Sequence, residues 1–234
     1  MSINKPKCVV FDFDYTLADS SIPVIECVNY GLKVLGLPEA RDELIRSTIG
    51  MDLITTLCTL AGKEHIDKGK QFIKLFTSRA DQVMVDGTDM FKFVPDVLRT
   101  IVDRDISVAI VSSKFRFRIE SILAREGILD YFDFIIGGED VENLKPDPEG
   151  LIKVLSNLGV FSAEAIYVGD SLIDSKTAKE ANVPFVAVLS GVTSSDSFIS
   201  EGCENIVKDI TAVSYTHLRA HETEADLVCR LLLE

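Results

Sequence analysis

Short apolar runs rich in β-forming residues alternate with helical patterns along most of the chain, and this alternation restricts the fold more than any other feature. Five such runs occur, at residues 8–14, 106–113, 132–138, 165–170 and 184–189. Near-continuous apolar strands separated by helices are typical of a parallel sheet that is covered on both faces. We therefore predict an α/β, Rossmann-like core with right-handed crossovers. A chain of 234 residues with 47% hydrophobic residues can fill its interior.

Residues 20–85 interrupt this alternation, because no strand pattern occurs there and helical periodicity dominates. The stretch is too long for a loop. We predict an inserted all-helical cap domain after the first strand, lying over the carboxyl edge of the sheet. The predicted core then comprises residues 1–19 and 86–212, with VDGTD at 85–89 as the return linker.

Polar side chains follow several predicted strands at their carboxyl ends, where open parallel sheets bind ligands. In chain order these side chains are Asp12, Asp14, Thr16, Ser112, Ser113, Lys145, Asp170 and Asp174. Two carboxylates as close in sequence as Asp12 and Asp14 repel each other. The pair therefore indicates either shared proton chemistry or a bound cation.

Taken together, these residues predict a metal-assisted phosphoryl-transfer site. Asp12 and Asp170 offer hard oxygen ligands that suit Mg²⁺, and the metal would let Asp12 approach an anionic phosphoester as a nucleophile. Ser112 and neighbouring N–H groups would hold phosphate oxygens. Lys145 would stabilise charge on Asp12 and the phosphoryl group, and a protonated Asp14 would give its proton to the leaving alkoxide.

Each of these motifs has a plainer interpretation when it is taken alone. A DxD pair after a strand also forms turns, and SSK or GDSLID also caps a helix. A lysine before proline is usually a solvated loop residue. Because all four motifs occur in this order at predicted strand ends, the joint hypothesis is stronger than any of its parts.

The chain resembles the haloacid dehalogenase-like superfamily over nearly all of residues 7–195, through the motifs DFDYT, VSS, KPDP and GDSLID. The resemblance implies that Asp12 is the nucleophile and Asp14 the acid and base. It implies that Ser112 and Lys145 stabilise phosphate and charge. The second aspartate of the first motif favours the phosphatase branch.

The same resemblance implies a Mg²⁺ site formed by Asp12, the Asp14 backbone carbonyl and Asp170. Asp174 would act there through water or through Lys145. The helical insertion is similar to the type-one cap of phosphoglycolate phosphatases and β-phosphoglucomutases, whose caps move as lids. We therefore expect hinges at the crossings 14–20 and 85–94.

Cap residues that could contact the leaving group lie in IRSTIGMDL, where relatives place a substrate-specificity loop. With the strand-end residues, the predicted substrate-binding set is Thr16, Arg46, Thr48, Gly50 and Ser113. The plainer alternative for Arg46 is a solvated helix charge. Tyr15 stands where glycine is commoner in relatives, and we expect its ring to narrow the entry beneath the cap.

Charge and cysteine content restrict the partners. The formal net charge of -13 argues against binding to nucleic acid or anionic membrane, because both are polyanions. No signal-peptide pattern or membrane-spanning stretch is present, so we predict a cytoplasmic protein. Five cysteines without CxxC spacing make disulfides and zinc unexpected. The expected partner is a small phosphorylated metabolite, and the oligomeric state does not follow from the sequence.

Residues 213–234 differ from everything before them, because their sequence resembles the in-frame translation of a sequencing-library adapter. We expect this tail to be non-native and the natural sequence to be truncated near Ala212, within a final strand and helix start at ENIVKDITA. The alternative is a natural amphipathic helix at ADLVCRLLLE.

The predicted function is Mg²⁺-dependent hydrolysis of a small phosphomonoester through an aspartyl-phosphate intermediate, with phosphoglycolate as the substrate that the resemblance suggests. Two alternatives stay open. A β-phosphoglucomutase-like sugar phosphomutase would have to shield the intermediate from water. A catalytically silent binding module would have no need for all of these charged groups in one pocket.

Overall fold

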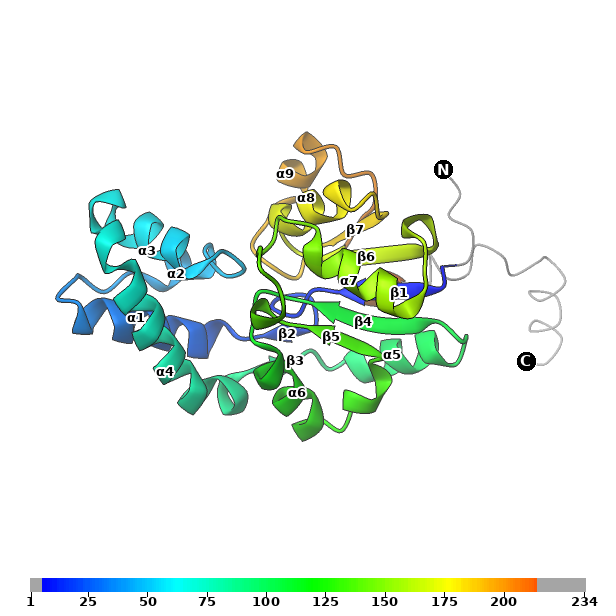
Figure 1. Cartoon of the computed structure of the whole chain (residues 1–234), viewed down its shortest axis with the longest axis horizontal. Coiled ribbons are helices and arrows are strands. Elements are labelled where there is room, and N and C mark those ends of the chain that lie inside the picture. The colour runs from blue at the N-terminus through cyan, green and yellow to red at the C-terminus, as the bar shows by residue number, and fades with distance from the viewer. Residues whose placement is uncertain (1–5, 214–234) are drawn as a thin grey trace, which may run out of the picture.

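A computed structural model describes residues 6–213 of the chain. Within them, a parallel sheet has six strands in the order β5-β4-β1-β6-β7-β8 (Figure 1). The strands are β1 (Cys8–Phe11), β4 (Ser107–Val111), β5 (Phe134–Ile136), β6 (Ala165–Gly169), β7 (Phe185–Val188) and β8 (Ile206–Val207). Because β1 pairs with both β4 and β6, its carboxyl end lies between the ends of those two strands.

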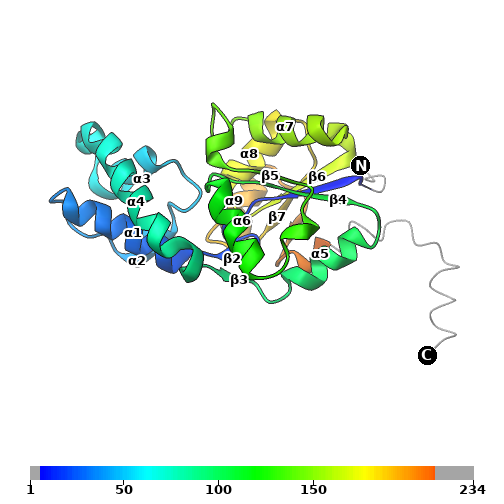
Figure 2. The same ribbon diagram turned by 60° about the horizontal axis from the view of Figure 1, so that its bottom comes forward.

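Side chains of the central strands alternate between two hydrophobic clusters, as the period of two in a strand requires. On one face, Val9 and Phe11 pack with α5 and α6. On the other face, Cys8 and Val10 pack with α7 and α8. Figure 2 shows these two helix pairs on opposite sides of the sheet. The helices of the core are α5 (Val94–Val102), α6 (Arg116–Arg125), α7 (Glu149–Leu158), α8 (Leu172–Glu180) and α9 (Ser195–Ser200), with 3₁₀ turns η2 (Leu129–Tyr131), η3 (Gly138–Asp140) and η4 (Ser162–Glu164).

The helical insertion, residues 21–87, is called the cap below, and it lies beyond the carboxyl ends of the strands (Figure 1). Its elements are α1 (Ser21–Val34), α2 (Asp42–Arg46), α3 (Leu53–Ala61), η1 (Lys63–Lys68) and α4 (Gly69–Gly87). The cap has its own apolar cluster, in which Leu32, Leu57 and Phe72 are fully buried. Helices α1 and α4 approach closely at Gly31, where a Cβ would lie 2.9 Å from the Phe72 ring.

Two very short strands join the cap to the core. Strands β2 (Ala18–Asp19) and β3 (Asp89–Met90) pair antiparallel, with Ala18 opposite Met90. Two arginines of α6 add contacts beside this junction. The buried Arg118 forms an ion pair with the half-exposed Asp81 of α4, and Arg125 donates to the carbonyl oxygens of Val85 and Thr88.

The structure confirms the predicted α/β sheet with an inserted helical cap, and each of the five predicted strands is present. The return linker predicted at 85–89 was wrong in extent, because α4 continues to Gly87 and Asp89 already belongs to β3. Packing explains the difference. Gly87 lies against Pro23 of α1, where a Cβ would approach the proline ring to 3.1 Å, so tertiary contact keeps a weak helix former helical.

The predicted division into residues 1–19 with 86–212 and residues 20–85 stays a prediction. The tail predicted at 213–234 lies outside the described residues except for Val213, which is buried beside Ile210. No helix within residues 6–213 combines the length and the apolar character that a membrane crossing requires.

Candidate active site

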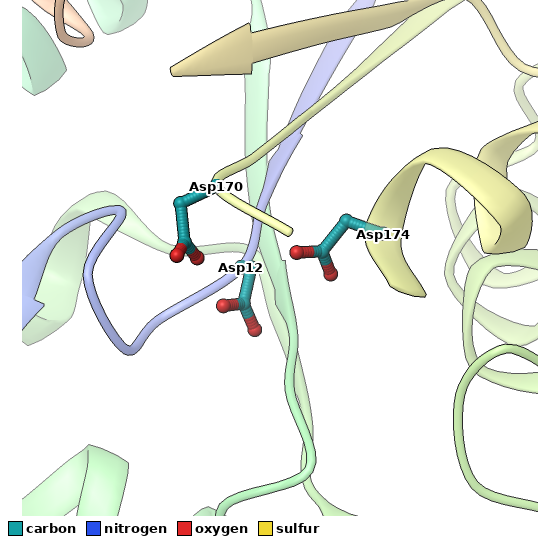
Figure 3. Close-up of side chains that lie close together, drawn as sticks. All are labelled: Asp12, Asp170 and Asp174. Carbon is teal, nitrogen blue, oxygen red and sulfur yellow. The ribbon is translucent and has the colours of Figure 1, made fainter. Parts of the chain in front are cut away.

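Three carboxyl groups meet at the carboxyl ends of β1 and β6. Asp12 follows β1 and Asp170 follows β6, and the two strands are neighbours with Phe11 opposite Val168. Asp174 comes from the first turn of α8, and the three side chains face a common space (Figure 3). One oxygen from each lies within 4.8 Å of the others, and the residues are only 5%, 6% and 1% exposed.

Lys145 is the cation of this cluster. Its Nζ lies 2.7 Å from Asp12 Oδ1 and 2.6 Å from Asp174 Oδ1. The hydroxyl of Tyr167 lies 3.2 Å from the same Nζ and 2.9 Å from Asp174 Oδ1. Because buried ion pairs need such additional hydrogen bonds to offset desolvation, this set of contacts fixes the lysine beside Asp12.

Asp174 is held in the first turn of its own helix, α8. Ser171 caps α8, and its hydroxyl accepts from the Asp174 amide at 3.1 Å while the Ser171 amide donates to Asp174 Oδ2 at 3.1 Å. This reciprocal capping box orients the carboxylate, whose other oxygen faces Lys145. The Asp174 carboxylate therefore holds the lysine in position.

Asp170 differs from its neighbours, because its carboxylate has no hydrogen bond or ion pair within residues 6–213. The close approach of Gly191 makes room for it, since a Cβ at residue 191 would collide with Asp170 Oδ2. A buried carboxylate without a donor suits a hard cation, so Asp12 and Asp170 fit the predicted magnesium ligands.

Burial and mutual repulsion shift the ionisation of the cluster. Burial raises the pKa of Asp12 to about 7, against the opposing charge of Lys145. Burial, followed by repulsion from Asp174 and Asp12, raises the pKa of Asp170 well above its usual range. Burial would lower the pKa of Lys145, but the charges of Asp12 and Asp174 outweigh it and raise that pKa well above its usual value.

Asp14, two residues after Asp12, has partners of its own. The Ser20 hydroxyl donates to Asp14 Oδ1, and Lys114 Nζ lies 3.2 Å from the same oxygen. The side chain of Lys114 is 4% exposed and also lies over the Phe13 ring. Asp14 and Asp12 both line one cavity between the cap and the core.

The predicted phosphate-binding serines lie at the same cavity. Ser112 and Ser113 line it just after β4, and the Lys114 amide donates to Ser112 Oγ at 3.3 Å. The Ser113 hydroxyl donates to the Gly50 carbonyl of the cap at 3.4 Å. Thr16 is fully buried, its hydroxyl has no partner within residues 6–213, and it does not line the cavity.

The structure separates the three predicted cap residues. Thr48 and Gly50 line the cavity, and Gly50 has a φ of 93°, a left-handed conformation that glycine adopts readily. Arg46 lies outside the lining, where its guanidinium donates to the Ser21 hydroxyl. Tyr15 is also outside the lining. It is buried with a φ of 60°, and its hydroxyl lacks a hydrogen-bond partner within residues 6–213.

A family model for haloacid dehalogenase-like hydrolases matches residues 9–188, a span that contains the complete carboxylate and lysine cluster. The chain belongs to this family. Membership in it and the predicted enzyme class, a phosphoric monoester hydrolase, are confirmed by the relatives.

Relatives of this haloacid dehalogenase-like hydrolase include a phosphoglycolate phosphatase of Salmonella choleraesuis, 32% identical over 78% of this chain and 81% of the relative. One of Yersinia pseudotuberculosis is 31% identical with the same coverage. Among solved structures, a candidate haloacid dehalogenase-like hydrolase of Bacteroides fragilis is 36% identical. It covers 89% of this chain and 100% of its own, with a TM-score of 0.86.

Sequence reasoning about this haloacid dehalogenase-like hydrolase missed four contributors to the site. Because Lys114 directly follows the VSS motif, its position in the sequence could have identified it as a site residue. Tyr167 is the polar-tipped member of an apolar strand, which is a weaker signal. Gly191 and Arg118 carry no local pattern that distinguishes them, because only the tertiary fold brings them to the site.

Proposed function

We propose that the protein is a Mg²⁺-dependent phosphatase that hydrolyses a small phosphomonoester through an aspartyl-phosphate intermediate on Asp12. The observation that carries this proposal is the pairing of Asp12 with Lys145 at 2.7 Å beside the unpaired carboxylate of Asp170. Such a set holds a nucleophile, a charge stabiliser and a ligand in one buried space. A purely structural ion pair would not leave Asp170 without a partner.

Asp12 and Asp170 would hold the magnesium ion, together with the Asp14 carbonyl that the family resemblance implies. The nearby carboxyl groups of Asp12, Asp14, Asp170 and Asp174 outnumber the cations Lys145 and Lys114, so the site would carry excess negative charge if all four were ionised. When bound, the ion would offset this charge and stabilise the negative charge of the phosphoryl group.

The chain's own residues would carry out two displacements. In the first, an Asp12 carboxylate oxygen bonds to phosphorus, the bond from phosphorus to the leaving oxygen breaks, and Asp14 gives that oxygen a proton. In the second, Asp14 takes a proton from water, the water oxygen bonds to phosphorus, and the bond to Asp12 breaks. Lys145 and Ser112 stabilise the phosphoryl oxygens in both steps.

Relatives named phosphoglycolate phosphatases support a small phosphomonoester as the substrate, and phosphoglycolate is the reference compound. Cytoplasmic location stays a prediction from the sequence. The sugar-phosphomutase alternative differs in one measurable respect, because it would move the phosphoryl group to an added sugar phosphate instead of releasing phosphate.

The test is phosphate release from a panel of small phosphoesters, with and without Mg²⁺, for the parent protein and Asp12→Asn. We expect metal-dependent release that Asp12→Asn lowers by at least ~10³-fold, because removing a nucleophile removes the main reaction path. Asp96→Asn is the matched control, since the Asp96 side chain is 80% exposed and far from the cluster in sequence. Release that survives Asp12→Asn would contradict the mechanism.

A further inference from the structure

The cavity between the cap and the strand ends carries charged side chains on its core side alone, within residues 6–213. Its volume is about 110 Å³, and its charged lining residues are Asp12, Asp14, Lys114 and Arg118, all from the core. The cap contributes apolar side chains and threonines, and none of its described lysines, arginines or histidines lines the cavity. A second acidic group on a substrate would therefore have to be recognised by a cation of the core.

The two cations of the lining have different surroundings. Lys114 Nζ lies 3.2 Å from Asp14 Oδ1, so its charge faces a proposed catalytic carboxylate. Arg118 lies in the first turn of α6, and its contacts reach the cap helix α4 instead. Its Nη2 lies 2.5 Å from Asp81 Oδ1 and 3.2 Å from the Thr77 carbonyl oxygen. Arg118 therefore lies where the cap meets the core and is paired with neither proposed catalytic carboxylate.

The guanidinium of Arg118 keeps donors that its partners do not use. Nε and Nη2 donate to Asp81 Oδ1, whereas Nη1 has no hydrogen-bond partner within residues 6–213. Nη1 is not fully buried, since the buried and unpartnered polar side-chain atoms of that range are the hydroxyls of Tyr15 and Thr16. The Arg118 side chain is only 5% exposed and lines the cavity, so the donors of Nη1 are open to a ligand there.

Arg118 is also held in place by its neighbours. Its Cζ lies 4.9 Å from the ring centroid of Phe115 and 5.2 Å from that of Phe117. These rings and the ion pair with Asp81 restrain a planar fork whose geometry matches a carboxylate. Asp81 is a weak competitor for the charge, because its side chain is 49% exposed and water screens it. A restrained cation with open donors loses little entropy when it binds a second anion.

Resting on the proposed function, we infer that Arg118 is a specificity-determining residue. It donates from Nη1 to an acidic group at the far end of the leaving alcohol while Asp12 attacks the phosphorus. The alcohol is short, because an apolar protein cavity that holds benzene measures ~150 Å³ and this one is smaller. Recognition of the second acidic group thus comes from α6 of the core and not from the cap loop at residues 46–50.

The test compares 2-phosphoglycolate with carbamoylmethyl phosphate, its amide, because the two share size and reacting bond and differ by one charge. In the parent protein we expect kcat/KM to be at least about thirtyfold higher for 2-phosphoglycolate, since charge-assisted hydrogen bonds are the stronger kind. Arg118→Gln should lower this ratio at least about tenfold. An arginine that only held the cap in place would lower both rates equally and leave the ratio unchanged.

Two further variants complete the experiment. Arg118→Lys keeps a charge for Asp81 but lacks the fork, so the ratio should fall here too, and this variant serves if Arg118→Gln does not fold. Arg116→Gln is the matched control from the same helix, because the Arg116 side chain is 48% exposed and does not line the cavity. It should leave the ratio unchanged.

The outcomes separate this inference from the proposed function. A parent ratio near one, or a ratio that the Arg118 variants leave unchanged, would overturn the inference. Where phosphate release still depends on Asp12, the proposed function would stand. Absence of Asp12-dependent release from both compounds and from every other ester of the panel would overturn the two together.

Discussion

The core and the cap use the same kinds of side chain in opposite ways. In the core, Asp12, Lys145 and Asp174 are buried charges that hold one another through short ion pairs at strand and helix ends. In the cap, the side chains directed at the same cavity are uncharged and mostly apolar. The cap's ion pairs lie elsewhere, as between Arg79 and Glu26 on its surface.

The two regions also differ in how they are stabilised. The core has six paired strands and two large apolar clusters, whereas the cap has helices around one smaller cluster, within residues 6–213. Strand pairing fixes the positions of the strand ends relative to one another. Charged groups can therefore be held there even though burying them lowers the stability of the fold. The comparison teaches that the charged and the apolar sides of the cavity are supplied by different parts of the chain.

The largest expected effect tests the core side of this comparison. Lys145→Met keeps the length of the side chain but removes the charge that faces Asp12 and Asp174. We expect kcat to fall by ~10²–10³-fold for every substrate, because charge on the phosphoryl group loses its stabiliser. The relative rates for different phosphoesters should stay within about twofold of those of the parent protein, since the cap side of the cavity is unchanged.

Steady-state kinetics with the panel of small phosphoesters check this prediction, and Lys176→Met is the matched control. Lys176 is an exposed residue of α8, the same helix that carries Asp174. A variant that strongly changed the relative rates among the phosphoesters would show that the two regions do not act separately.

The next effect concerns stability and uses one buried thiol in each region. Burial raises the pKa of Cys8 in β1 and of Cys27 in α1 to about 12, so neither thiol is ionised at pH 8 in the folded protein. In a background with Cys58, Cys203 and Cys229 replaced by serine, we expect iodoacetamide to label Cys27 at least about tenfold faster than Cys8. Opening the cap alone exposes Cys27, whereas Cys8 requires the sheet to open.

Mass spectrometry of the labelled peptides over time gives the two rates. Equal rates would mean that cap and core open as one cooperative unit. The core and the cap would then differ in the charge of the side chains that they place at the cavity, but not in their stability.

The smallest expected effect is a pH dependence that belongs to the core. The folded pKa of Asp12 is about 7, while an unfolded aspartate has one of about 3.9. Between these values the folded protein binds more protons than the unfolded chain at this residue, so the free energy of unfolding falls as pH rises. This stabilisation is fully present below about pH 4 and lost by about pH 7.

In EDTA, we therefore expect the ionisation of Asp12 to lower the Tm by roughly 3 to 6 °C between pH 5.5 and pH 8. Asp12→Asn should make the dependence weaker, leaving the part that comes from the raised pKa of Asp170, and Asp96→Asn should retain all of it. Thermal unfolding by circular dichroism checks the result, and a steeper fall in Asp12→Asn would contradict the origin that we assign to it.

The parts of the molecule that the sequence could predict are those with a local pattern. The strands follow from apolar runs, and Asp12, Lys145 and Asp170 follow from motifs at strand ends. Gly191 could not be predicted, because its role depends on a close approach to Asp170 from a distant loop. The pairing of Arg118 with Asp81 joins two helices far apart in sequence, and no local period encodes it.

The same limit applies to the roles of single cap residues. Thr48 and Gly50 line the cavity, but Arg46, only two residues before Thr48, turns away to Ser21. A substrate loop can be located by its position between helices. The direction of each side chain in it depends on the end of α2, which packing against the other cap helices determines.

The paired strands β2 and β3 have a mechanical consequence for the motion of the cap. A helical segment attached by one flexible link could rotate about three axes. Here the outgoing and returning links lie side by side with Ala18 opposite Met90, and the Phe91 amide donates to the Leu17 carbonyl at 3.0 Å. Twisting about the chain direction would break that ladder, whereas bending across it would not. A cap that opened about this junction would therefore keep essentially one degree of rotational freedom, and its apolar side would return to the same place over the strand ends after each opening.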